Sequence, residues 1–121
     1  MDYDPNRPIY LQVMQLIKQD IITGKRPPGD KLPGGRELAS LYAINPNTAA
    51  RVYQELEREG MCETRRGLGT FVTGDPERIR RAREEMAEEA VRRFLREMAN
   101  LGVSREEARA LIQRQEGTND A

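Results

Sequence analysis

Two short helical patterns separated by a tight turn constrain the fold of this chain more than any other feature. The first pattern covers residues 35–42, and the second begins at Pro46 and runs to Glu59. Asn45 is a favourable N-cap because its side-chain oxygen can accept hydrogen bonds from the free amides of the first turn. Pro46 suits the first helical position, where its missing N–H costs nothing. The spacing therefore predicts a helix-turn-helix.

A further helix and a hairpin are predicted on the two sides of this motif. Apolar residues at helical spacing indicate a helix over residues 8–24, and Lys31-Leu32 is compatible with a very short strand. Two short strands are predicted at residues 61–65 and 70–73, joined by the tip Arg66-Gly67-Leu68-Gly69. A hairpin that follows a helix-turn-helix is typical of a winged helix, which commonly places its third helix in the major groove of DNA.

Two more helices are predicted in the tail of the chain. Pro76, after the cap Asp75, begins a long helix that ends near Asn100. Ser104 begins the last helix, with Glu107 three residues later forming a capping box. From Gly117 onward the chain is expected to fray.

An apolar stripe along these tail helices is too large for the two helices to enclose by themselves, because small units bury little surface. A second copy of the chain would cover the stripe and match the symmetry of paired DNA half-sites. The predicted fold class is mainly α with a small β-hairpin: a winged helix-turn-helix DNA-binding domain over residues 1–74, followed by a two-helix dimerisation tail over residues 75–121. The candidate dimer-interface residues are Ile79, Met86, Ala90, Phe94, Met98 and Leu111.

Candidate DNA contacts lie on the second and third helices. The polar side of the third helix begins with Asn47 and Arg51, with Thr48 at its edge, and such donors and acceptors read base edges and phosphates. The second helix offers Arg36 and free backbone amides to a phosphate. The alternative interpretation of the third-helix residues is a solvated helix face, and that of Arg36 is an ion pair with a surface carboxylate.

The hairpin tip is a more specific signal. Arg65, Arg66 and Gly67 place two arginines beside a glycine with no acid between them. Glycine lets the backbone approach a sugar–phosphate wall closely, and arginine is favoured in a narrow minor groove. We expect DNA contact here.

Composition excludes several classes of function. Twenty basic and twenty acidic residues give zero net charge, so a DNA site must be a local patch. With no histidine and one cysteine, the chain has no disulfide, no His/Cys zinc site and no His-dependent catalysis. We expect no enzyme, no metal and no cofactor.

Cys62 is expected to be buried, with redox sensing as the alternative. A free cysteine and the lack of a signal peptide or membrane span favour the cytoplasm.

Several ordered stretches resemble the GntR family of bacterial transcription regulators over residues 7 to 73. They are Pro8-Ile9-Tyr10-Leu11-Gln12, Pro28-Gly29-Asp30-Lys31-Leu32-Pro33, Arg36-Glu37-Leu38-Ala39, Asn45-Pro46-Asn47-Thr48, Tyr53-Gln54-Glu55-Leu56-Glu57-Arg58-Glu59-Gly60 and Arg66-Gly67-Leu68-Gly69-Thr70-Phe71-Val72. The Asn-Pro-Asn-Thr stretch and the short tail are similar to the YtrA branch, which lacks a large effector-binding domain and uses its tail mainly to dimerise.

The resemblance implies a winged-helix homodimer on a partly palindromic operator. The DNA contacts that it implies are Arg36, Asn45, Asn47, Thr48, Arg51, Arg66 and Gly67. The chain departs from many family members at Gly34, where they have serine, and at Pro46 and Ala50, where they carry arginines. Base readout is therefore expected to rest more on Asn47, Thr48 and Arg51.

Together these features predict a sequence-specific transcription regulator, a repressor, that binds a double-stranded DNA operator. A winged helix that binds protein instead of DNA is the alternative, and it would favour acids on the third helix and no arginines at the wing tip. The tail leaves little room for a pocket of about 300 Å³. A small-molecule effector, if there is one, is therefore expected between the tail and the winged helix or across the dimer.

Overall fold

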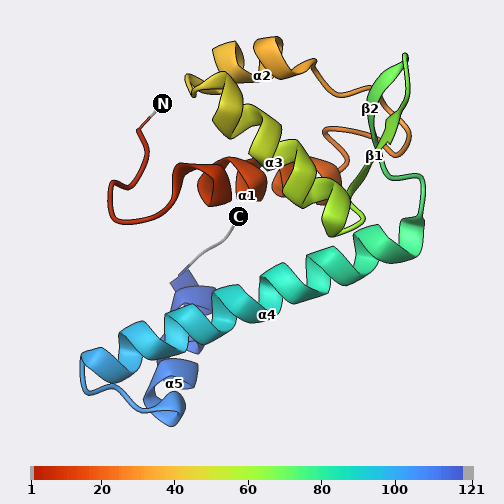
Figure 1. Cartoon of the computed structure of the whole chain (residues 1–121). Helices are drawn as coiled ribbons and strands as arrows, with labels where there is room; N and C mark the ends of the chain where they lie inside the picture. The colour runs from red at the N-terminus through yellow and green to blue at the C-terminus, as the bar shows by residue number, and fades with distance from the viewer. Residues whose placement is uncertain (1, 119–121) are drawn as a thin grey trace. The chain divides into compact units, whose positions relative to one another are not determined.

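The structure, a computed structural model, describes residues 2–118. Within these residues the chain forms five helices and one antiparallel two-stranded hairpin (Figure 1). The elements are α1 (Ile9–Ile22), α2 (Gly35–Tyr42), α3 (Pro46–Arg58), β1 (Cys62–Arg65), β2 (Gly69–Val72), α4 (Pro76–Asn100) and α5 (Arg105–Thr118). The predicted fold class, mainly α with a winged helix-turn-helix and a helical C-terminal region, is confirmed.

The turn and cap of the helix-turn-helix form as their residues predict. Asn45 Oδ1 accepts a hydrogen bond from the Asn47 amide at 2.7 Å, and Pro46 occupies the first position of α3. Ala43 adopts the left-handed conformation, with φ 53°, and so reverses the chain between α2 and α3. The first turn of α3, which carries the candidates Asn47 and Thr48, is thereby fixed by local hydrogen bonds.

The start of α5 is also as predicted, but its end differs. Glu107 N donates to Ser104 Oγ at 3.1 Å, and Ser104 N donates to Glu107 Oε1 at 3.4 Å, which completes the capping box. The helix continues through Gly117 to Thr118. The prediction of fraying is therefore wrong for these two positions, because helical hydrogen bonds carry the backbone past the glycine. The rest of that prediction lies outside the described residues.

One hydrophobic core joins α1, α2 and α3. On α3, Ala49, Val52 and Leu56 are completely buried. Leu41 of α2, although apolar, exposes 57% of its surface. Successive residues of a helix differ by about 100° in direction, so a helix as short as α2 cannot bury every apolar position. The core residues of α1 and α2 are Val13, Met14, Ile17, Ile21, Leu38, Ala39 and Tyr42.

The hairpin is extended by the segment that precedes α2. Strands β1 and β2 pair from Cys62 opposite Val72 to Arg65 opposite Gly69. Lys31 forms an isolated antiparallel bridge with Phe71 on the other side of β2, which fits the short strand predicted there. This bridge ties the wing to the chain that leads into α2.

The first turns of α4 pack on the winged-helix core. Ala82 is buried in that core, and Ile79 is half-buried against it. Arg78 Nε donates to the Glu59 carbonyl oxygen, at the C-cap of α3, at 2.7 Å. One compact unit accordingly extends to Arg83, and a second begins at Glu84. The functional division at residue 74 stays a prediction.

We expect Arg78→Ala to lower the free energy of unfolding by about 1.5 to 3 kcal/mol, because the partly buried Glu59 carbonyl loses a charged donor. Urea denaturation at fixed protein concentration measures this change. Arg81→Ala is the matched control on the exposed surface of the same helix and should stay within about 0.5 kcal/mol of the wild type. Equal losses from the two variants would contradict a specific role for the Arg78 contact.

Cys62 is buried, as predicted from its position in the strand beside α3. Its thiol lies 3.9 Å from the Tyr53 carbonyl oxygen. Burial, followed by the nearby charges of Glu57 and Glu63, raises the pKa of the Cys62 thiol to about 12. A buried, protonated thiol is unreactive, which favours a structural role.

At pH 8 this pKa leaves a thiolate fraction roughly a thousandfold below that of an ordinary cysteine. We therefore expect the native protein to react at least about a hundredfold more slowly than the urea-unfolded chain with an aromatic disulfide reagent, followed by absorbance. The pKa of the Cys62 thiol is higher in the folded protein than in the unfolded chain. The free energy of unfolding should therefore fall as pH rises from about 9 to 12. Rapid reaction of the native protein at pH 8 would favour redox sensing instead.

Candidate nucleic-acid interface

The predicted base-reading residues lie on the exposed side of α3. Asn47 and Arg51 are exposed, and Thr48 is half-buried at the edge of the helix. Asn45 lies at the start of the same face, but its side-chain oxygen is already engaged as the cap of α3. Asn47 and Arg51 are therefore the side chains of this group with the freest access to a ligand.

Arg51 is held by a contact that the sequence analysis missed. Its guanidinium lies over the ring of Tyr10 from α1, 3.8 Å from the ring centroid. Tyr10 lies on the apolar side of α1, and its ring is half-buried against the core. No pattern in the sequence indicates that the same ring also contacts α3.

The N-terminus of α2 presents free backbone amides beside Arg36. Gly34 is the N-cap, and no side chain accepts a hydrogen bond from the first turn, as expected where glycine replaces serine. Arg36 is exposed and makes no salt bridge within residues 2–118. The partial positive charge of a helix N-terminus and this guanidinium together suit a phosphate group.

The two arginines of the wing differ in their surroundings. Arg65 Nη2 lies 2.8 Å from Glu63 Oε1, and its guanidinium stacks on the Phe71 ring at 4.4 Å from the centroid. Arg66 is exposed and makes no salt bridge in the described part of the chain. Gly67 has a φ of 77°, the left-handed conformation that the tight turn requires. Arg66 is therefore the more available of the two for a phosphate.

Lys31 is a further cation at the wing that the sequence analysis did not place there. Gly69 has a φ of 122°, and a Cβ built on it would lie only 2.8 Å from Lys31 Cε. The end of the lysine side chain therefore lies against the wing at Gly69, where a side chain would displace it and the positive φ favours glycine. The pairing of Lys31 with Phe71, which is far away in the sequence, could not be found from periodicity.

The acidic residues of α3 are engaged at its C-terminal end. Glu55 pairs with Arg58, and Glu59 pairs with Lys18 of α1. Glu57 Oε2 accepts a hydrogen bond from Thr64 Oγ1 at 3.2 Å. The N-terminal half of α3 therefore keeps an exposed cation, although the chain as a whole is neutral.

The predicted dimer-interface residues fall into two groups. Ile79 packs on the winged-helix core. The others lie in the tail unit: Met86, Phe94, Met98 and Leu111 are half-buried there, and Ala90 is exposed. The same unit exposes three large apolar side chains that were not among the candidates, namely Val91, Leu101 and Ile112.

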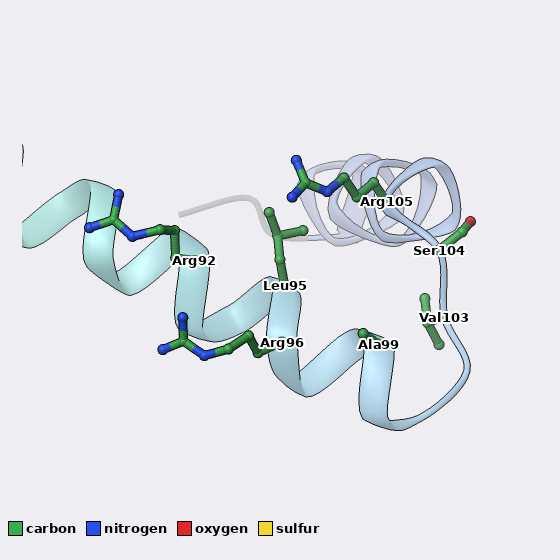
Figure 2. Close-up of a pocket in the computed structure, with 7 residues that line it drawn as sticks. All are labelled: Arg92, Leu95, Arg96, Ala99, Val103, Ser104 and Arg105. Atoms are coloured by element: carbon green, nitrogen blue, oxygen red, sulfur yellow. The ribbon is translucent and has the colours of Figure 1, made fainter.

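An open groove of about 470 Å³ lies between α4 and α5 in the tail unit (Figure 2). The expectation that the tail leaves little room for a volume of about 300 Å³ is therefore wrong, although this hollow is open to solvent and not enclosed. An effector stays a prediction. The groove is lined by Arg92, Leu95, Arg96, Ala99, Val103, Ser104 and Arg105.

Residues 2–118 include no cluster of three or more His, Cys, Asp or Glu residues that could hold a metal ion. Among the described helices, none is long and apolar enough to cross a membrane.

Comparisons with known proteins agree with this geometry. The family model described as "Bacterial regulatory proteins, gntR family" matches residues 9–72. The chain is 39% identical over 105 residues to the helix-turn-helix regulator YhcF of Bacillus subtilis, a match that covers 87% of each protein. It is 48% identical over 73 residues to the transcriptional repressor YtrA of the same organism, covering 60% of this chain and 56% of YtrA.

Solved structures show the same fold. A GntR family transcriptional regulator from Listeria monocytogenes superposes with a TM-score of 0.84 at 37% identity, covering 93% of this chain and 98% of that one. The DNA-binding domain of AraR in complex with operator ORX1 superposes with a TM-score of 0.55 at 28% identity, covering 60% of this chain and 93% of that one. The chain belongs to the GntR family of bacterial regulatory proteins.

Proposed function

We propose that this protein is a sequence-specific, DNA-binding transcriptional repressor that acts as a homodimer on a two-fold symmetric operator. The observation that carries this proposal is the N-terminal half of α3, where Asn47 and Arg51 are both exposed and Arg51 makes no salt bridge within residues 2–118. Arginine and asparagine are the side chains best suited to bidentate contacts with guanine and adenine in the major groove.

The residues on either side of α3 take the role of phosphate contacts in this proposal. Arg36 and the free amides of α2 suit one backbone, and Arg66 with Gly67 suits the backbone or minor groove at the wing. Lys31 joins the wing contacts, and Arg65 contributes less because Glu63 already neutralises it. Two relatives support the assignment, since YtrA of Bacillus subtilis is named a repressor and AraR is described in complex with an operator.

Dimerisation through the tail is the second part of the proposal. The unit that begins at Glu84 is small, and it exposes Leu101 at 73%, Val91 at 55% and Ile112 at 45% of their surfaces. Apolar surface of this kind is costly to leave in water, and a second copy would cover it. A two-fold dimer also presents two α3 helices to two half-sites.

Other functions are less well supported. The relatives are transcriptional regulators, which favours a non-enzymatic role in the cytoplasm, where bacterial DNA lies. Arg36 of α2, Arg51 of α3 and Arg66 of the wing are exposed and make no salt bridge within the described residues. A winged helix that binds only protein does not explain these three arginines.

Selection of duplexes from a random-sequence library by the full-length protein tests the function. We expect an inverted repeat whose half-sites lie one helical turn, or a multiple of a turn, apart. On that duplex Arg51→Ala should cost about 1 to 3 kcal/mol of binding free energy and reduce discrimination against scrambled DNA. Arg66→Ala should weaken both duplexes by similar factors and lower the slope of log affinity against log salt by about one.

A selection that yields no preferred sequence would refute specific DNA binding. Circular dichroism confirms that each variant is folded. If Arg66→Ala reduced discrimination as much as Arg51→Ala does, the wing would also read the sequence, through groove shape.

For the dimer, we expect Ala90→Glu to shift the full-length protein toward monomers in light scattering at micromolar concentration. The substitution introduces a charge onto the apolar stripe of α4, and a buried unpaired charge is costly. Ser40→Glu adds the same charge to an exposed position of α2 and should leave the dimer intact. Dissociation by both variants, or by neither, would place the interface elsewhere.

A further inference from the structure

The contact between Tyr10 and Arg51 joins α1 to the polar side of α3. The Arg51 guanidinium lies 3.8 Å from the centroid of the Tyr10 ring. Tyr10 is half-buried and packed against the core, whereas Arg51 is exposed. A ring fixed by the core therefore holds a side chain that would otherwise move freely in solvent.

This kind of contact leaves the donors of the guanidinium available. A cation–π contact uses the flat face of the guanidinium, whereas its five N–H groups point outward in the plane. A bidentate contact with a base edge uses that plane. The Tyr10 ring therefore restricts the orientation of Arg51 without occupying the groups that would read a base.

The second stacked arginine of the protein shows the contrast. Arg65 lies over Phe71, but it also forms an ion pair with Glu63 at 2.8 Å. Arg51 makes no salt bridge within residues 2–118. Arg51 is thus both restrained by a ring and without an acidic partner in the described part of the chain.

We propose that Tyr10 is a positioning residue for sequence discrimination, because its ring pre-orients the Arg51 guanidinium for the DNA major groove. The proposal rests on the proposed function, in which Arg51 reads a base. Arginine has several rotatable bonds, and the entropy lost on fixing them opposes binding. A ring that restricts them in the free protein removes part of that cost, and random DNA, which makes no base contact, gains nothing from it.

The test compares the duplex selected by the wild-type protein with a scrambled duplex of the same composition. Tyr10→Leu removes the ring. For this variant the affinity for the selected duplex divided by the affinity for the scrambled duplex should fall about two- to fivefold, the size expected for an exposed cation–π contact. Tyr10→Phe keeps the ring and should retain the ratio. Thermal melting checks the fold of each variant, and Tyr10→Met replaces Tyr10→Leu if the latter does not fold.

A double-mutant cycle separates positioning from a direct contact. In the Arg51→Ala background, Tyr10→Leu should cause no further fall in the ratio. A further fall would overturn the proposal, because Tyr10 would act without Arg51. If the ratio of the two affinities also fell in Tyr10→Phe, the proposal would be overturned in favour of a contact through the hydroxyl group. An unchanged or higher ratio in Tyr10→Leu would also overturn it. These results leave the proposed function intact, whereas a wild-type protein that selects no duplex refutes the function itself.

Discussion

The burial of one face of α3 is the constraint on which the rest of the DNA-facing surface depends. Ala49, Val52 and Leu56 are completely enclosed by the core that α1 and α2 share. Because successive helical residues differ by about 100°, fixing this face also fixes the directions of Asn47 and Arg51. Turning α3 to expose other residues would open cavities, and the loss of one buried leucine side chain alone costs about 2–5 kcal/mol. Packing, rather than charge, therefore decides which side chains meet a partner.

Local chemistry explains how much of the structure could be predicted from the sequence. Caps such as Asn45 and Ser104 satisfy backbone groups within one turn, so the helix starts are visible in the sequence alone. Contacts between distant segments leave no periodic pattern, which is why Tyr10 beside Arg51 and Lys31 across Gly69 were not predicted. The residues that contact DNA stay predictions, because the direction of an exposed side chain does not identify its partner.

Zero net charge is compatible with a basic surface because Glu55 and Glu59, at the C-terminal end of α3, are paired with cations other than Arg51. These two acids pair with Arg58 and Lys18, and Arg51 lies nearer the N-terminal end with no salt bridge in the described chain. Glu55 lies one helical turn, about 6 Å, from Arg51, but it is already paired with Arg58 and so does not neutralise Arg51. The local arrangement of charge therefore determines the character of this surface, and the total charge of the chain says little about it.

The wing tip combines two positions that tolerate little substitution with one that tolerates much. Gly67 and Gly69 both have positive φ values, and at Gly69 a side chain would also meet the Lys31 stem. Leu68 between them exposes 62% of its surface, and its amide already donates to the Arg65 carbonyl oxygen at 2.8 Å. The backbone of the turn thus does not depend on the identity of residue 68. Natural variation at this single position could alter what the tip presents to a groove, while the hairpin that carries it stays unchanged.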